Sequence, residues 1–442
     1  MDLTEGTIWK QILLFALPLL ASSFIQQLYN TVDLLFVGNL VGKEASAAVG
    51  SSSLLVACVV GFFTGISVGA GVITAQRVGA GDKAGIGEAV HTAVAMGLLG
   101  GACLSVIGFF SASTLLGWMN VPEEIMPEAA SYLKLYFAGL FSIVTYNMCA
   151  GIIRATGNSR VPMMIQLIGG IINVGVDALF VAGLGWGVKG AAMATLFSQT
   201  SAAAMSLFYL MREEEAYKLH LSRLSVHKDS ALKILKVGVP AGIQSLVIEF
   251  SNVLIQYQIN GFNVDAIAAF AVYFQAELPI YYPIAAFGQA ATTFSGQNIG
   301  AGNLKRMKQG TRVCIAMGIA VTLVTISLVV GLERQIFWLF NKDEAVIAYG
   351  IQVVNYSFPF YWLYVIHEVL ASAMRGAGRS AAPMLIIMGN LCILRSILLF
   401  IIMAFCHDVR GVAVLYPITW FLTAVSMTLY YKFGKWQPEF QK

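Results

Sequence analysis

The stretch R-E-E-E-A-Y-K-L-H-L-S-R-L-S-V-H-K-D-S-A-L-K-I-L-K, from Arg212 to Lys236, is the only long hydrophilic interval inside the chain. About 210 strongly apolar residues precede it and about 200 follow it. Four motifs of the first flank recur in the second, each shifted by about 221 residues. The pairs are Pro18 with Pro240, Gln76–Asp82 with Gln297–Asn303, Arg154–Ser159 with Arg375–Ser380, and Val188–Gly190 with Val409–Gly411. Four matches in order at one spacing indicate an internal duplication, and the hydrophilic interval joins its two copies.

The composition is that of a polytopic helical membrane protein. Of 442 residues, 58% are hydrophobic and 11% are charged, whereas roughly a quarter are charged in soluble proteins. Apolar runs long enough to span a bilayer recur along the whole chain. The net charge of +4 is too small to indicate nucleic-acid binding. The six cysteines form no C-x-x-C pair, no phosphate-cradling P-loop is present, and the polar segment Met1–Lys10 does not resemble a signal peptide.

We therefore predict an all-α fold of twelve transmembrane helices in two six-helix bundles related by a pseudo-twofold axis. The predicted domains are an N-terminal bundle (1–211), a cytoplasmic linker (212–230) and a C-terminal bundle (231–442). The predicted helices are Ile8–Val37, Ser46–Thr74, Ala89–Met119, Ala129–Ile153, Pro162–Leu184, Val188–Met211, Ala231–Ile259, Ala266–Phe294, Thr311–Phe340, Ala345–Met374, Pro383–Phe405 and Val409–Tyr431. Most of the 27 lysines and arginines fall on the side that holds the N-terminus and the linker. The positive-inside rule then places both termini in the cytoplasm.

Small residues within the predicted spans indicate close helix contacts. The segments Gly65–Gly71 and Gly97–Gly101 are rich in glycine and resemble tight-packing seams. Gly65–Gly69 also matches the G-x-S-x-G pattern of hydrolases, but the strand–turn–helix setting of that motif is absent from the sequence. We interpret it as a packing motif.

Charged residues inside a membrane are costly and usually functional. The predicted spans contain five acids and two bases, namely Asp33, Asp177, Glu249, Glu277 and Glu368 against Lys134 and Arg395. This excess of acids favours a cationic cargo over an anionic one.

The first copy contains polar residues at similar depths in three predicted helices. Asp33, Asp177 and Thr195 each lie one to two turns from the outer end of a span, and Asn173 lies one turn before Asp177. Carboxylate and amide oxygens suit a proton or a sodium ion. Two close carboxylates in a poorly hydrated site disfavour ionising together, so we expect Asp33 and Asp177 to titrate as one unit. The alternative is that Asn173 and Asp177 only tie helices together.

The second copy contains glutamates accompanied by aromatic residues. Carboxylates with aromatic rings suit a lipophilic cation, although this half could equally hold a second coupling ion, or one glutamate could pair with Arg395. Glu368 could be structural, and His367 is interpreted as a helix-packing residue. The candidate site residues are Glu249, Glu277, Tyr257, Gln275, Tyr281 and Glu368.

Several motifs together resemble the multidrug and toxic compound extrusion (MATE) family over essentially the whole chain. They are L-P-L-L-A-S-S-F-I-Q-Q-L-Y-N-T-V-D-L-L-F-V-G (Leu17–Gly38), Q-R-V-G-A-G-D (Gln76–Asp82), Arg154–Asn158 after Asn147, Asn173-x-x-x-Asp177, and M-R-G-A-G (Met374–Gly378). The resemblance implies a coupling-ion site at Asp33, Asn147, Asn173, Asp177 and Thr195, and a bend of the first helix at Pro18. If the ion is sodium, Asp33, Asn173 and Asp177 are its expected metal ligands. A depth count places Asn147 nearer the cytoplasm than the other four.

These observations predict a proton- or sodium-coupled antiporter that exports amphipathic, mostly cationic organic compounds by alternating access. The alternative is a flippase for lipids or lipid-linked saccharides, which would need basic residues in its cavity to hold a pyrophosphate. An intramembrane enzyme is disfavoured, because no nucleophile with a nearby base is apparent, so we expect no catalytic residues. We expect no cofactor besides the coupling ion, and a monomer in the cell inner (plasma) membrane that contacts lipids and binds no nucleic acid.

Overall fold

The computed structural model describes residues 1–442 except 37, 39–40, 42, 214–215, 406–407 and 438–442, and it leaves the side chains of 34 and 43–48 undescribed. Helices make up most of the described residues, and no strand occurs among them. The chain forms two compact units. Unit 1 contains Met1–Asp2 and Leu17–Gly242, and unit 2 contains Leu3–Ala16 and Ile243–Lys442. The predicted linker and the predicted C-terminal bundle each include positions outside the described residues.

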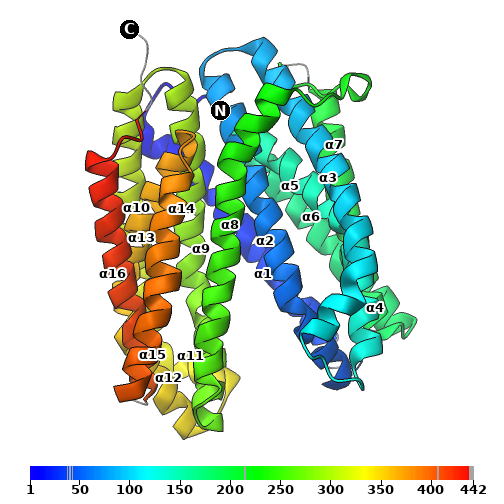
Figure 1. Cartoon of the computed structure of the whole chain (residues 1–442), viewed down its shortest axis with the longest axis vertical. Helices are drawn as coiled ribbons and strands as arrows, with labels where there is room; N and C mark the ends of the chain where they lie inside the picture. Colours follow the sequence, from blue (N-terminus) through cyan, green and yellow to red (C-terminus); the bar gives the residue numbers. More distant parts are fainter. Residues whose placement is uncertain (37, 39–40, 42, 214–215, 406–407, 438–442) are drawn as a thin grey trace. The chain divides into compact units, whose positions relative to one another are not determined.

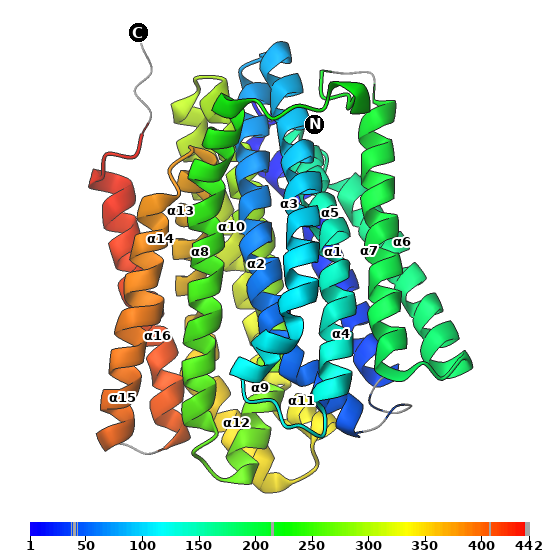
Figure 2. The same cartoon turned by 45° about the vertical axis from the view of Figure 1, so that its right-hand side comes forward.

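The helices of unit 1 stand roughly side by side in Figure 2. They are the later part of α1 (Ile8–Phe36), α2 (Lys43–Gly79), α3 (Lys83–Trp118), α4 (Met126–Ala138), α5 (Leu140–Ala155), α6 (Arg160–Asp177) with a π-helical continuation (Ala178–Gly183), α7 (Gly187–Arg212), and the first part of α8 (Lys228–Ile259). A short 3-10 turn, Leu221–Arg223, interrupts the segment between α7 and α8.

Unit 2 has the same succession of helices, which Figure 1 shows in green to red. Besides the first part of α1 and the rest of α8, it contains α9 (Val264–Gly300), α10 (Leu304–Gly331), α11 (Glu333–Phe340), α12 (Glu344–Ser357), a 3-10 turn (Phe358–Phe360), α13 (Tyr361–Gly376), α14 (Ala381–Ile387), a π-helical segment (Met388–Leu394), α15 (Arg395–Phe405) and α16 (Val409–Phe433).

A helix or a run of consecutive helices occupies each of the twelve predicted spans. Eight described helices are long and apolar enough to cross a membrane, and a ninth span results if α4 and α5 count as one. The other three predicted spans coincide with α7, α9 and the α12–α13 pair. Large side chains such as Phe110 and Phe405 are 77% and 90% exposed, as expected of helices whose outer faces meet lipid. The predicted all-α polytopic fold is confirmed.

Besides the fifth and eleventh predicted helices, which contain π-helical segments, three others differ from the observed ones. The fourth is bent by 41° where α4 gives way to α5 at Gly139. The ninth ends at Gly331, and a separate short helix, α11, follows it. The tenth is interrupted by a 3-10 turn at Phe358–Phe360, because Pro359 has no backbone N–H to continue the α-helical ladder. Pro18 and Pro240, in contrast, lie inside the unbroken helices α1 and α8.

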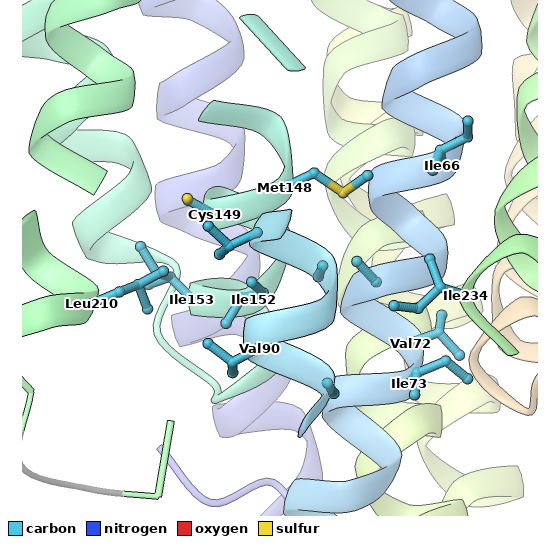
Figure 3. Close-up of a cluster of buried hydrophobic side chains, with 14 of the residues drawn as sticks. Ile66, Val72, Ile73, Val90, Met148, Cys149, Ile152, Ile153, Leu210 and Ile234 are labelled. Atoms are coloured by element: carbon cyan, nitrogen blue, oxygen red, sulfur yellow. The ribbon is translucent and has the colours of Figure 1, made fainter. Parts of the chain in front are cut away.

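Close packing of α2, α3 and α5 forms the core of unit 1. Figure 3 shows Met148 and Cys149 of α5 among apolar side chains such as Ile66 of α2 and Val90 of α3. Buried apolar area of this kind contributes about 25 cal/mol per Å² to stability where it is removed from water, but inside lipid the gain comes from close packing.

Glycines permit this close packing, as the sequence predicted. A Cβ added at Gly65 of α2 would lie 2.7 Å from the carbonyl carbon of Ala241 in α8, and one at Gly69 would lie 2.8 Å from the backbone nitrogen of Gly238. A Cβ at Gly101 of α3 would lie 2.9 Å from the Cα of Phe141. The G-x-S-x-G segment is therefore a helix seam, and its interpretation as a packing motif is confirmed.

Candidate functional site

Two acidic side chains meet in unit 1. Asp33 lies in α1, and Asp177 is the last residue of α6. Their carboxyl groups lie within hydrogen-bonding reach of each other. Asp177 is fully buried, and Asn173, one turn earlier in α6, is 2% exposed. The structure therefore brings together three of the five residues predicted for the coupling-ion site.

Most oxygens of this acid pair are buried without a hydrogen-bond donor among the described residues. Oδ1 of Asp33, both carboxylate oxygens of Asp177 and Oδ1 of Asn173 are buried without a hydrogen-bond partner among the described residues. An unsatisfied buried acceptor is costly, and an unpaired buried carboxylate is more so. A proton shared between the carboxyl groups, or a cation bound by these oxygens, would remove that cost. The oxygen ligands fit sodium, which prefers carboxylate and carbonyl oxygens to nitrogen or sulfur.

A contact one turn deeper fixes α1 against α6. Nε2 of Gln166 donates a hydrogen bond of 2.8 Å to the hydroxyl of Tyr29, four residues before Asp33. A Cβ at Gly170 would lie 3.0 Å from Cδ1 of Tyr29, so only glycine lets the ring approach this closely. Because residues four apart share a helix face, this contact places Asp33 opposite the end of α6.

The backbone changes just after the acid pair. The π-helical segment Ala178–Gly183 begins immediately after Asp177. Such π segments are rare and concentrate at functional sites. The apolar sequence A-L-F-V-A-G gave no signal for it.

Two tyrosines missed by the sequence analysis lie near the acid pair. Tyr132 and Tyr136 of α4 both interact electrostatically with Asp33, and Tyr132 also interacts with Asp177. Their rings lie 6.1 Å apart. The spacing of four residues, which puts both rings on one face of a predicted span, is the signal that could have found them.

The other two predicted site residues are not joined to this pair. Nδ2 of Asn147 donates to the carbonyl of Ile143 in its own helix, α5, at 2.9 Å. Thr195 lies partly buried in α7. Among the described residues no hydrogen bond connects either one to Asp33 or Asp177, so their roles in ion binding stay predictions.

Glu277 of unit 2 lies in a compensated setting. The hydroxyl of Tyr361 donates a hydrogen bond to Glu277, and Arg395 interacts with Glu277 electrostatically. Arg395 is 5% exposed. It donates from Nε and Nη2 to Oγ1 of Thr419, at 3.2 and 3.1 Å, and lies 5.2 Å from the ring centre of Tyr416. None of the ion pairs between described residues involves Arg395.

Glu368 forms a close ion pair instead. Nη2 of Arg375 lies 2.6 Å from Oε1 of Glu368 and 2.7 Å from Oγ of Ser372. Nη1 of the same arginine donates to Oε1 of Gln244 in α8, at 3.4 Å. Glu368 therefore joins α13 to α8 through Arg375, which supports the structural interpretation of this glutamate.

Of the remaining unit 2 candidates, Tyr281 interacts with the glutamates, whereas Tyr257 and Gln275 do not form hydrogen bonds to them among the described residues. The hydroxyl of Tyr281 interacts electrostatically with all three glutamates, at positions 249, 277 and 368, and with Arg375. Tyr257 is 70% exposed and Gln275 is exposed, and no hydrogen bond among the described residues joins either to these glutamates. His367 is 1% exposed, with its ring 4.3 Å from that of Tyr364, as expected of a packing residue.

Neither site resembles a transition-metal centre. Within the part of the chain that the structure describes, no three histidines, cysteines or acids come together as metal ligands. The acid pair with Asn173 is therefore suited to a proton or to a hard monovalent cation.

Comparison with known proteins gives a consistent result. The MatE family model matches the chain twice, over residues 18–179 and 240–402, which is the duplication inferred from the repeated motifs. The chain is 28% identical over 438 residues to the probable multidrug resistance protein YpnP of Bacillus subtilis, covering 99% of this chain and 97% of that protein. It is 24% identical over 437 residues to the FAD transporter of Shewanella oneidensis, covering 96% of this chain and 94% of that protein. A solved structure described as the outward-facing conformation of a multidrug resistance MATE family transporter superposes with a TM-score of 0.91 at 24% identity, covering 97% and 96% of the two chains.

Proposed function

The chain belongs to the MatE family, whose members are transporters rather than enzymes, and from this premise we propose that it exports amphipathic organic cations in exchange for a proton or a sodium ion. The observation that carries the proposal is the uncompensated acid pair of unit 1. Oδ1 of Asp33 and both carboxylate oxygens of Asp177 are buried without a hydrogen-bond donor among the described residues. An arrangement that costs so much without a cation suits a site whose task is to bind and release one.

The coupling follows from a difference in affinity between two states. A proton or sodium ion that enters from outside neutralises the pair and removes the repulsion between Asp33 and Asp177. Only a site that binds the ion differently in the two states can shift their balance. Pro18 lies in the same helix as Asp33 and leaves one backbone hydrogen bond of α1 unmade. We propose that a change of bend at this proline is the movement that the ion drives.

We propose that the cargo binds near the glutamates that interact with Tyr281 in unit 2. Glu368 is neutralised by Arg375 at 2.6 Å, and Glu277 accepts a hydrogen bond from Tyr361 and interacts electrostatically with Arg395. Glu249 interacts with the side chain of Asn252 and has no ion pair among the described residues, so we take its charge as the least compensated of the three. We propose that Glu249, with the ring of Tyr281, attracts a lipophilic cation.

A second candidate cargo is an organic anion, or the headgroup of a lipid as in a flippase. Arg395 is buried in unit 2 without a carboxylate at ion-pair distance among the described residues, and a guanidinium of this kind suits phosphate or carboxylate. The similarity to a protein named an FAD transporter also supports this alternative.

The decisive experiment measures efflux from proteoliposomes under a proton gradient alone and under a sodium gradient alone. We expect one gradient to drive efflux of a lipophilic cation, and Asp33→Asn or Asp177→Asn to abolish it without loss of expression. Asp265→Asn, an acid-to-amide change at the start of α9, is the matched control and should leave efflux unchanged. If the Asp33→Asn/Asp177→Asn double variant still pumps near the wild-type rate, the coupling site lies elsewhere.

We also propose that the protein is a monomer in the plasma membrane. We further propose that both termini lie in the cytoplasm, because most lysines and arginines lie on the side that holds the N-terminus. A cysteine placed at Thr7, which is exposed, should react with an impermeant maleimide in inside-out vesicles and not in intact cells. Reaction in intact cells would reverse the orientation.

A further inference from the structure

A short segment ahead of α1, Leu3–Gly6, is held in unit 2, and we call it the N-terminal strap. The side chain of Leu3 is 1% exposed. Its backbone N–H donates to Oε1 of Gln297 at 2.9 Å, and its carbonyl accepts from Nδ2 of Asn298 at 3.1 Å. Both acceptor and donor belong to the last turn of α9. The strap is therefore seated by side chains and does not lie loosely on the surface.

A single arginine, Arg306, forms hydrogen bonds to several residues of the strap. Arg306, in the first turn of α10, donates from Nε to the carbonyl of Leu3 at 3.3 Å and from Nη1 to the carbonyl of Gly6 at 2.9 Å. Its Nη2 donates to the carbonyl of Glu5 and to Oε1 of Gln11, each at 2.8 Å. Gln11 lies in the first turn of α1. The planar guanidinium thus binds four oxygens of the strap and of the start of α1, a pattern that a lysine ammonium cannot reproduce.

The first copy holds its counterpart segment in a similar way, with different residues. The segment before α8 donates from the backbone of His220 to Nε2 of His91 and from that of His227 to Oγ1 of Thr92, each at 3.1 Å. Arg77 donates to Oγ of Ser230 at 2.9 Å. Each copy therefore fixes the segment that leads into the first helix of the other copy.

The arginine has changed position between the copies. At the repeat spacing, Arg77 corresponds to Asn298, and Arg306 corresponds to Gly85. Each copy therefore has an arginine on one side of the turn between its second and third helices and a smaller residue on the other. An arginine beside this turn forms the contact in both copies, although it lies on opposite sides of the turn. This recurrence argues that both copies need to hold the segment that leads into a first helix.

The strap matters because it leads into α1, the helix that contains Pro18 and Asp33. The residues Leu3–Ala16 belong to unit 2, whereas α1 from Leu17 onward, including Asp33, belongs to unit 1. Pro18 lies directly after the point at which the helix changes unit. A helix fixed at its first turns can respond to a change at Asp33 by bending, whereas a helix free at that end could slide or tilt as a whole.

We propose that Arg306 is a positioning residue for ion coupling: it anchors the start of α1 in unit 2, so that ion binding at Asp33 is converted into a bend at Pro18. This inference rests on the proposed function of the acid pair. It assigns Arg306 no contact with ion or cargo. Loss of the anchor should uncouple ion flow from cargo flow while leaving ion binding intact.

The test uses Arg306→Ala and Arg306→Lys in the full-length protein, with Lys305→Ala as control. Lys305 is exposed and precedes Arg306 in the same turn of α10, so its removal subtracts one charge without touching the strap. Seating of the strap is read from the rate at which Leu3→Cys, in a background without the six native cysteines, reacts with a water-soluble maleimide. We expect Arg306→Ala to react about tenfold faster or more, the factor for losing at least one hydrogen bond to a charged donor, and Lys305→Ala to match the parent.

Coupling is read in the same proteoliposomes as the number of ions moved per cargo molecule. We expect this ratio to depart from the wild-type value by several-fold in Arg306→Ala, with an intermediate value in Arg306→Lys, while equilibrium ion binding stays unchanged. If Arg306→Ala does not fold, Arg306→Lys, which keeps the charge, decides the question alone.

Two results would overturn the inference. One is an unchanged labelling rate in the arginine variants, which would show that Arg306 does not hold the strap. The other is faster labelling with a wild-type ion-to-cargo ratio, which would make the strap merely structural. If Asp33→Asn pumps normally, the proposed function fails instead, and the labelling experiment still reports on the strap.

Discussion

The acids of unit 1 and those of unit 2 differ in what surrounds them. Asp33 and Asp177 lie together, and three of their four carboxylate oxygens are buried without a donor among the described residues, whereas Glu368 has Arg375 at 2.6 Å. The repeat sharpens the contrast, because Glu368 corresponds to Asn147 and Arg375 corresponds to Arg154. The second copy has its acid where an arginine neutralises it. An acid inside the membrane thus indicates ion binding only where no base compensates it.

The largest effect should come from breaking the compensated pair. Arg375→Ala leaves Glu368 mostly buried without its partner, and removing one member of a buried pair costs about 3–5 kcal/mol. At about 2–4 °C per kcal/mol for a unit of some 200 residues, the melting temperature in detergent should fall by about 6 °C or more. Thermal unfolding followed by tryptophan fluorescence checks this.

The matched control removes both charges at once. Glu368→Gln with Arg375→Met should recover most of the loss, since replacing a whole buried pair is often neutral. If the double variant is as unstable as Arg375→Ala, the arginine acts through its packing and its bond to Gln244, and the charge comparison loses its basis.

The glycine seam between α2 and α8 is the next strongest difference between the copies. Gly65 and Gly69 correspond to Ala286 and Ala290 at the repeat spacing, so only the first copy has glycine at these positions. Gly65→Ala should destabilise the protein by about 1–3 kcal/mol, because the new methyl group meets backbone that cannot rotate away. Gly100→Ala, where nothing lies within 4 Å, should have no such cost. Equal melting temperatures for the two variants would mean that α8 shifts freely along α2.

At the acid pair, in contrast, we expect a substitution to raise the melting temperature rather than to lower it. Asp177→Asn removes a buried charge beside Asp33 and should raise the melting temperature by about 2–4 °C, the equivalent of about 1 kcal/mol. If sodium is the coupling ion, adding it at ten times its Kd should stabilise the wild type by about 1.4 kcal/mol and leave the variant unaffected. A fall in melting temperature on Asp177→Asn would show that the carboxylate has a structural partner and would remove the contrast with Glu368.

The sequence predicted much of this fold because its signals are local. Apolar length located all twelve spans, and the repeated motifs identified the duplication that the family match at residues 18–179 and 240–402 now supports. Glycine spacing located the seams. The break at Gly139 and the π-helical segment after Asp177 gave no such signal, because in lipid nearly every residue of a span is apolar and the helical period is hidden.

Site residues were predictable only where depth alone decides proximity. Asp33 and Asp177 lie at matched depths in their helices and do meet. Asn147 was attached to the pair by resemblance, and its side chain bonds within α5. The strap was missed because its acceptors are backbone carbonyls, which no residue type reveals, and because Arg306 is one of many basic residues on the side of the N-terminus.

The smallest expected effect concerns the start of the last helix in each copy. In unit 2, Oδ1 of Asp408 accepts from the backbone of Arg410 at 2.8 Å and caps α16. The corresponding position before α7 is Gly187, with a positive φ of 58°, and that helix has no side-chain cap. Hydrogen bonds from the side chain and backbone of Arg410 hold the pKa of Asp408 below its usual range. A lowered pKa means that this stabilisation is present above the unfolded value of about 4 and is lost as the pH falls through the folded value.

Asp408→Asn tests this sign, because asparagine caps a helix as well as aspartate but does not titrate. Amide hydrogen exchange of the first turn of α16 should accelerate in the wild type when the pH is lowered below about 4, after correction for the intrinsic pH dependence of exchange. The asparagine variant should show no such acceleration. Because the carboxylate side chain is 33% exposed and that of Arg410 54%, the effect should stay below about 1 kcal/mol.

The first turn of α7, which begins at a glycine, should exchange faster than that of α16 at neutral pH and show no corrected pH dependence there. If the two turns respond alike, the Asp408 cap contributes nothing that Gly187 lacks.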